Sequence, residues 1–183
     1  MIETLFAAID RLLSEKKQVI IAIDGPCTAG KTTLAGKLQK KYGCNVIHMD
    51  EFFLRPEQRT PERLAAPGGN VDYERFREEV LLPLSAGEAF SYRPFSCARM
   101  VLSEPVSVPS CPLTVVEGTY STHPFFQNPY DLTIFLTVDS KTQQQRIGQR
   151  EAWKQEMFRN VWIPMEQAYF QCFDIPSSCN LIF

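Results

Sequence analysis

The chain has 183 residues, of which 44% are hydrophobic and 22% are charged. These values exclude wholesale disorder, and the length suits one domain, residues 1–183, with a substantial core. A formal net charge of −2 provides no basic field, so we expect no nucleic-acid partner. No stretch reaches the roughly 20 apolar residues of a membrane span. The six cysteines lack metal-ligand spacing, which favours a cytoplasmic protein with free thiols and no membrane partner.

The first half of the chain alternates between helix and strand patterns. Apolar residues recur on one helical face within residues 2–13, which predicts an amphipathic helix. The apolar run at residues 19–23 predicts a strand buried on both faces, and residues 31–42 predict a helix. A second strand is expected at residues 45–50, ending at a carboxylate. The long connection at residues 51–71 is rich in proline and glycine, and a connection of this length is more often functional than idle.

The second half continues this alternation. The expected elements are a helix from Asp72, a hairpin of residues 90–93 and 106–108, strands at 113–116 and 132–138, helices from Ser140 and at 164–173, and a strand at 180–183. Such alternation predicts an α/β fold with a doubly wound, mostly parallel five-stranded sheet and helices on both faces. We expect a substrate-side hairpin within residues 88–112 and a helical lid at residues 141–163.

A glycine-rich motif follows the first predicted strand. The sequence GPCTAGKT matches G-x-x-x-x-G-K-[ST], the phosphate-binding loop (P-loop), and it opens a predicted helix as that motif requires. The glycines allow successive N–H groups to surround a phosphate, the lysine reaches the β- and γ-phosphates, and the final threonine binds Mg²⁺. The residues expected to bind the nucleotide are Gly25, Pro26, Cys27, Thr28, Ala29, Gly30, Lys31, Thr32 and Thr33.

Two carboxylates end neighbouring predicted strands, where ligands gather in doubly wound sheets. Asp50 follows the second strand and could accept or orient the proton of a substrate hydroxyl during phosphoryl transfer. Glu117 follows the third strand, where a P-loop protein places a carboxylate beside its metal. The alternatives are a helix cap for Asp50 and an ordinary turn carboxylate for Glu117.

Two arginines complete the set of candidate catalytic residues. Arg146 and Arg150 are four residues apart on the helix after the fourth strand, so they could clamp the transferring phosphate from one face. Pairing with nearby glutamates on a solvated face is the alternative. For Arg55, Arg59 and Arg63 in the long connection, surface pairing with interleaved glutamates is favoured.

These segments together resemble the uridine kinase-like branch of P-loop kinases, which includes phosphoribulokinase and bacterial pantothenate kinase. The resemblance covers most of the chain and rests on GPCTAGKTT, MDEFF, GGNVDYERF, VVEGTYS and DLTIFLTVDSKTQQQRIGQR. It implies that Asp50 is the catalytic base, that Glu117 lies on the metal side and that Asp72 contacts the acceptor's hydroxyls. In the hairpin this chain lacks the family's histidine and keeps Phe95 and Arg99, which the resemblance assigns to acceptor binding.

The sequence therefore predicts a kinase that uses ATP and Mg²⁺ to phosphorylate a hydroxyl of a small-molecule acceptor. One alternative is a kinase of a phosphorylated sugar or a pantothenate-like acid, for which the arginines of the long connection would need to face the site. Another is a nucleotide-dependent switch or ATPase, although the chain has no Asn-Lys-x-Asp motif for guanine. The acceptor, the choice between ATP and GTP and the oligomeric state stay open.

Overall fold

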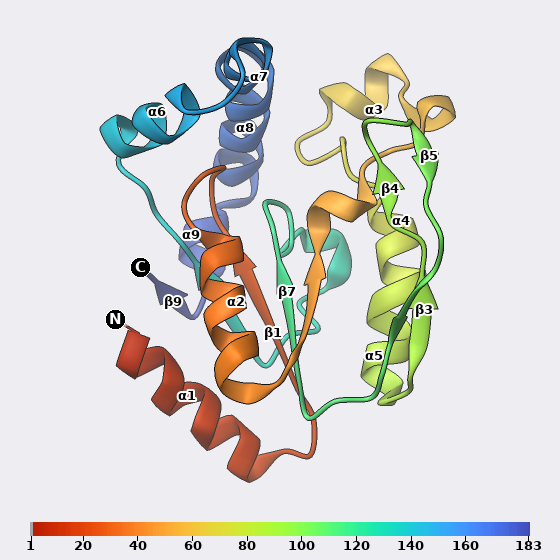
Figure 1. Cartoon of the computed structure of the whole chain (residues 1–183), viewed down its shortest axis with the longest axis vertical. Coiled ribbons are helices and arrows are strands. Elements are labelled where there is room, and N and C mark those ends of the chain that lie inside the picture. Colours follow the sequence, from red (N-terminus) through yellow and green to blue (C-terminus); the bar gives the residue numbers. More distant parts are fainter. Residues whose placement is uncertain (1) are drawn as a thin grey trace.

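The computed structural model of the protein describes residues 2–183 (Figure 1). A five-stranded sheet lies at its centre with the strand order β2-β7-β1-β8-β9, and every pairing is parallel. The strands are β1 (Val19–Asp24), β2 (Asn45–His48), β7 (Leu113–Glu117), β8 (Leu132–Phe135) and β9 (Leu181–Ile182). The predicted α/β fold with a five-stranded sheet is confirmed. Because all strands run the same way, their carboxyl ends meet along one edge.

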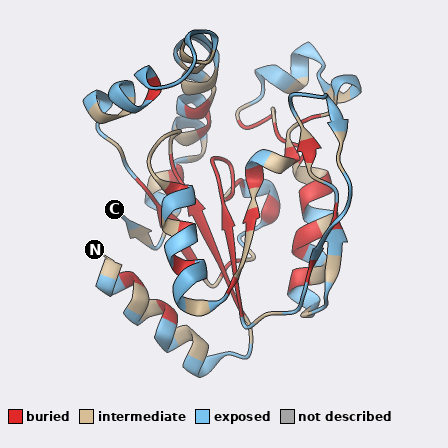
Figure 2. Ribbon diagram, in the orientation of Figure 1, coloured by how far each residue is buried: buried red, intermediate tan, exposed pale blue. Residues whose placement is uncertain are grey.

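Both faces of this sheet are covered, as the continuous apolar runs in its strands require. Alternate residues of β1 enter two separate cores. Ile21 and Ile23 pack with α1 (Ile2–Glu15) and α2 (Lys31–Tyr42), whereas Ile20 and Ala22 pack with helices of the opposite face. Figure 2 shows the two adjacent central strands, β1 and β7, as buried along their whole length. The sheet is therefore a rigid platform for the loops at its carboxyl edge.

Two long helices each contain a wider π-helical turn that ends two residues before a proline. The first comprises α4 (Tyr73–Phe76), the π turn Arg77–Leu81 and α5 (Leu82–Ala86); the second comprises α7 (Ala152–Met157), the π turn Phe158–Trp162 and α8 (Ile163–Phe173). Pro83 and Pro164 have no N–H and would collide with the carbonyl four residues back. The preceding N–H groups, of Leu82 and Ile163, instead donate five residues back. The helix predicted at residues 164–173 is thus the end of a longer one.

The predicted hairpin is present beside the main sheet. Strands β3 (Phe90–Tyr92) and β6 (Val106–Val108) pair antiparallel, and β4 (Phe95–Ser96) pairs with β5 (Val101–Leu102) above them. The remaining elements are α3 (Pro61–Ala65), α6 (Ser140–Gly148), α9 (Ile175–Ser178) and 3₁₀ turns at Met49–Phe52, Pro56–Gln58 and Pro124–Phe126. Within residues 2–183, no helix combines the length and the apolar character needed to cross a membrane.

The second strand is shorter than the sequence predicts, and the difference places a candidate residue. Its last pairing joins His48 to Glu117. The next residue on the neighbouring strand is Gly118, where an added Cβ would lie 2.7 Å from the Cβ of Met49. This close approach ends the ladder, and the chain turns into the 3₁₀ turn that carries Asp50. Asp50 therefore lies beyond the sheet edge rather than within the strand.

Candidate active site

The loop between β1 and α2 has the backbone geometry of a phosphate cradle. Gly25 has φ of +137°, and a Cβ there would lie 2.3 Å from the carbonyl oxygen of Leu136, so only glycine fits. Gly30, with φ of +101°, precedes α2, whose first turn has no side-chain cap. The N–H groups of that turn therefore face outward without a capping side chain. Within residues 2–183, the buried Oγ1 of Thr28 also has no hydrogen-bond partner. These features fit a bound phosphate chain.

Lys31 folds back over the loop that precedes it. Its Nζ donates to the carbonyl oxygens of Gly25 at 2.7 Å and Pro26 at 2.9 Å, and to Oγ1 of Thr119 at 3.2 Å. The side chain is buried, with 9% of its surface exposed. In this position Lys31 is paired with groups of the loop itself, and these are the contacts that a bound phosphate would have to replace.

A cavity of about 1580 Å³ opens above the loop. Its lining includes the loop, Asp50 and Glu117, together with residues from two separate parts of the molecule. In Figure 1, α7 and α8 rise on one side of the loop, and α3 with the β4–β5 hairpin rises on the other. Both sides supply lining residues, among them Trp162 and Met165 from α8 and its π turn, and Met100 from the hairpin. The cavity is large enough for a nucleotide and a second small molecule.

Two oxygen-bearing side chains meet at the base of the cavity. Thr32 donates its hydroxyl to Oε1 of Glu117 at 3.0 Å, and Nδ1 of His48 lies 2.5 Å from the same oxygen. The hydrogen bond to Glu117 raises the pKa of His48. Because both contacts use Oε1, Oε2 has no hydrogen-bond partner within residues 2–183. A hydroxyl beside a carboxylate is a donor set that Mg²⁺ prefers, so the residues predicted for metal binding fit that ion.

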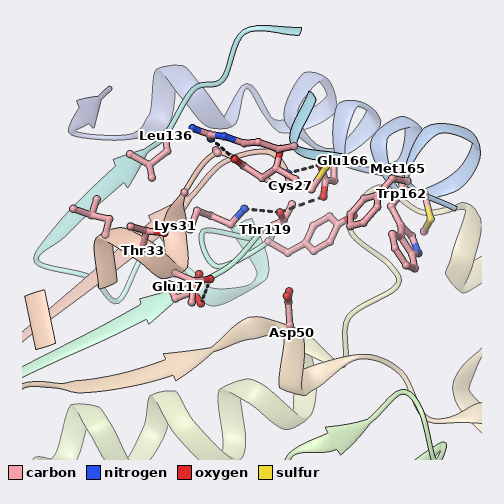
Figure 3. A pocket seen from close by; sticks show the side chains of 18 of the residues that line it. Cys27, Lys31, Thr33, Asp50, Glu117, Thr119, Leu136, Trp162, Met165 and Glu166 are labelled. Carbon is pink, nitrogen blue, oxygen red and sulfur yellow. Dashed lines mark hydrogen bonds between the residues drawn. The ribbon is translucent and has the colours of Figure 1, made fainter. Parts of the chain in front are cut away.

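Asp50 faces the loop from the other wall of the cavity. Figure 3 shows its carboxylate pointing toward the region of Lys31 and Thr119. Solvent reaches the residue, but the surrounding cavity walls still remove water from the carboxyl group, which raises its pKa. The positive charge of Lys31 opposes this shift and the negative charge of Glu117 adds to it. The result is a carboxylate with enhanced basicity opposite the phosphate loop.

The two arginines predicted to clamp the transferring phosphate both line the cavity but belong to different segments. Arg146 lies on α6 and donates Nη1 to the carbonyl oxygen of Thr28 at 2.6 Å. The helix ends at Gly148, so Arg150 follows it, and the prediction that the two share a helical face is wrong. The nearby Glu151 pairs with Lys154 at 2.7 Å rather than with either arginine.

The three residues predicted to bind the acceptor are not part of the cavity lining. Asp72 is buried, caps the backbone N–H of Arg75 at 3.2 Å and accepts Nε2 of Gln58 at 2.9 Å. Phe95 is buried, with 4% of its surface exposed. Arg99 is exposed and donates to Oγ of Ser103 at 3.1 Å. Their assignment to the acceptor stays a prediction.

Other residues of the same segments do reach the cavity. Cys97 and Met100 from the hairpin line it, as does Arg59 from the long connection. The guanidinium of Arg59 lies 5.9 Å from the ring centre of Phe95, and its Nε donates to the carbonyl oxygen of Leu54 at 3.0 Å. Among the arginines of the long connection, Arg59 is the one that faces the cavity.

Sequence reasoning missed a buried polar cluster between β1 and α8. Asp24, the last residue of β1, is fully buried and accepts the hydroxyl of Tyr169 at 3.0 Å. Glu166, one turn earlier on α8, accepts the N–H of Cys27 at 2.9 Å and contacts Oγ1 of Thr119 at 3.4 Å. Burial raises the pKa of both carboxyl groups and raises that of the Cys27 thiol to about 12. The cluster joins α8 to the phosphate loop.

Comparison with solved structures finds the same fold in other proteins. A possible uridine kinase from Bacillus stearothermophilus superimposes with a TM-score of 0.69 and 17% identity, over 98% of this chain and 99% of that one. The YGR205w protein superimposes with a TM-score of 0.58 and 14% identity, over 93% and 84%. No protein-family model matches the sequence, and no curated protein matches it significantly. The resemblance to the uridine kinase-like branch is thus confirmed at the level of the fold.

Proposed function

We propose that this protein is a small-molecule kinase that transfers the γ-phosphoryl group of ATP to a hydroxyl of its acceptor. The observation that carries the proposal is the placement of Asp50 opposite Lys31 across one cavity. A switch or ATPase could also use a carboxylate to orient water, but the cavity beside Asp50 leaves room for a second small molecule next to the nucleotide, which favours an acceptor. The structural likeness to a possible uridine kinase agrees with this reading. The free thiols and the absence of a spanning helix among residues 2–183 suit our proposal of a cytoplasmic enzyme.

In this proposal each wall of the cavity has a separate task. The loop N–H groups and Lys31 bind the phosphates, and Arg146 offsets negative charge on the transferring group. Thr32 and Glu117 hold Mg²⁺, which when bound neutralises charge on the phosphates. The acceptor oxygen attacks the γ-phosphorus, the bond from that phosphorus to the bridging oxygen of ADP breaks, and Asp50 takes the hydroxyl proton. Positioning and charge stabilisation supply most of the rate.

In this proposal the acceptor site lies between the two parts of the molecule that rise on either side of the loop. Trp162, Met165 and Met100 give it an apolar character, and Arg59 adds one cationic group. An acceptor with an apolar or planar body and an anionic substituent would suit this lining. This favours the phosphorylated or carboxylate-bearing acceptors among the alternatives, with Arg59 alone among the arginines of the long connection in position to contact the anion.

The test is ADP release from Mg-ATP in the presence of nucleosides, sugar phosphates, pantothenate and related hydroxy acids. We expect one class to stimulate turnover, and Asp50→Asn to lower kcat by about 10²–10⁴ with the KM for ATP little changed. Glu62→Gln, an exposed change of equal charge in the same connection, is the control and should behave as wild type. Tight ATP binding with slow hydrolysis that no acceptor stimulates would refute the kinase and favour the switch.

A further inference from the structure

The phosphate loop already holds an anion that belongs to the protein itself. Oε2 of Glu166 accepts the N–H of Cys27 at 2.9 Å, and this N–H lies in the stretch of backbone that a P-loop uses to bind phosphate. The carboxylate is buried, with 6% of its residue surface exposed. It comes from a helix 139 residues away in the chain. A backbone N–H that donates to this carboxylate is not available to a phosphate oxygen.

The loop lysine is engaged at the same point. Figure 3 shows Lys31, Thr119, Glu166 and Cys27 joined by a continuous series of hydrogen bonds. Lys31 donates to Oγ1 of Thr119 at 3.2 Å, and Glu166 contacts that same hydroxyl at 3.4 Å. Because P-loop lysines serve the β- and γ-phosphates, Glu166 lies on the side of the loop where the terminal phosphate of a triphosphate belongs.

The helix that carries Glu166 also carries two apolar residues of the proposed acceptor site, Trp162 and Met165, which form what we call the acceptor wall. Trp162 and Met165 both line the cavity, and both lie in the helical turn that directly precedes Glu166. Residues four apart share a helical face, so Trp162 and Glu166 point into the same space. A movement of α8 that withdraws Glu166 from the loop would therefore also change the position of Trp162.

We propose that Glu166 is a positioning residue that occupies the place of the terminal phosphate and is displaced when a nucleoside triphosphate binds. A carboxylate and a γ-phosphate cannot both accept the same N–H, and two negative charges placed side by side at this N–H repel each other. A diphosphate lacks the competing group and leaves Glu166 in place. The number of phosphates on the nucleotide is thereby coupled to α8 and to the acceptor wall. This inference rests on nucleotide binding as proposed above.

Burial supports this assignment because it makes the charged carboxylate costly to hold without compensation. Burial raises the pKa of Glu166, and the N–H of Cys27 and the charge of Lys31 oppose that rise. Either nucleotide would draw the charge of Lys31 toward its phosphates, but in this proposal only a triphosphate adds a γ-phosphate that competes for the N–H of Cys27. The carboxylate would then have to leave its site or bind a proton, and either change breaks its contact with the loop.

The test compares the affinity of a non-hydrolysable ATP analogue with that of ADP by titration calorimetry. In Glu166→Gln an amide oxygen can still accept the N–H of Cys27, but the charge is gone. We expect this variant to bind the triphosphate analogue about tenfold more tightly and ADP within about twofold of wild type. Glu156→Gln, an exposed change of equal charge on α7, should leave both affinities unchanged. Equal changes for both nucleotides, or weaker triphosphate binding, would show a purely structural role and overturn the inference.

A second measurement leaves Glu166 unsubstituted and follows the fluorescence of Trp162. Trp153→Phe, at a side chain with 59% exposure and no role in the cavity, leaves Trp162 as the single tryptophan. The triphosphate analogue should change the fluorescence of Trp162, and ADP should not. Identical spectra with both nucleotides would overturn the coupling even where Glu166→Gln fails to fold. If neither nucleotide binds wild type, the proposed function itself fails, which separates that failure from this one.

Discussion

Asp24 lies where the end of β1, the phosphate loop and α8 meet, and replacing it by asparagine removes the negative charge at this junction. The carboxylate has no solvent exposure. Its Oδ1 accepts the N–H groups of Gly25 and Tyr120 at 2.7 and 3.2 Å. Its Oδ2 accepts the N–H and hydroxyl of Thr122 at 3.0 and 2.7 Å and the hydroxyl of Tyr169 at 3.0 Å. All of these partners donate, so the site is built for an acceptor with two oxygens.

Asparagine supplies one oxygen and one NH₂ group. If the oxygen takes the place of Oδ1, the hydroxyls of Thr122 and Tyr169 can turn to accept, but the N–H of Thr122 then faces another donor. A buried N–H without a partner costs about 1–3 kcal/mol, and the surviving bonds lose the extra strength of an ionised acceptor. After the gain from no longer desolvating a charge is subtracted, the net loss of unfolding free energy is about 3 kcal/mol. For a domain of this size that lowers Tm by roughly 6–12 °C.

Differential scanning calorimetry of Asp24→Asn measures this directly, and Tyr169→Phe is the matched comparison. The second variant removes one hydroxyl and leaves a carboxylate with its other donors, so it should cost about 1 kcal/mol, or roughly 2–4 °C. We also expect Asp24→Asn to weaken nucleotide binding, because Gly25, whose N–H donates to Asp24, is the first residue of the phosphate loop. A Tm for Asp24→Asn no lower than that of Tyr169→Phe would refute the claim that the charge of Asp24 stabilises this junction.

Three further predictions concern the chemistry of the cavity. Because the pKa of Asp50 is raised and the base must be ionised, kcat/KM should fall with decreasing pH at a higher pH than a free aspartate would give, and Asp50→Asn should remove this limb. Glu117→Gln should raise the Mg²⁺ concentration for half-maximal activity by roughly 10- to 100-fold, measured by metal titration of the kinase assay. Arg59→Ala should raise KM for an anionic acceptor by about tenfold or more, whereas Arg55→Ala, outside the cavity, should not; equal KM values for both would assign Arg59 to the surface.

The main sheet could be predicted because local sequence decides it. Continuous apolar runs such as residues 19–23 and 113–116 suit strands with two covered faces, and the GPCTAGKT motif fixes where the first strand passes into its helix. The pairing of Thr32 with Glu117 also follows from this topology, because parallel strands bring their carboxyl ends together. These predictions needed only period, motif and strand order.

The acceptor side could not be predicted because it depends on side-chain direction in short, irregular segments. Phe95 turns into the core on a two-residue strand, and Cys97 in the following turn reaches the cavity instead. A shift of one residue in such a hairpin exchanges the inward and outward side chains, and nothing in the local pattern fixes it. Glu166 was missed for a different reason. Its partner in the loop is far away in the chain, and a single glutamate on a helix carries no spacing signal.

The construction of α8 shows how a local event at the loop could move one part of that helix and not another. Its far end is held by the buried bond from Tyr169 to Asp24, which lies beneath the sheet edge and does not face the cavity. Its near end follows the π turn at residues 158–162, where the regular hydrogen-bond pattern is already broken before Pro164. Breaks of this kind are places where helices bend. Glu166 lies between the π turn and Tyr169, so loss of its contact with Cys27 would leave α8 held by the Tyr169 bond alone, and we expect any movement of Trp162 to be a bend at the π turn rather than a displacement of the whole helix.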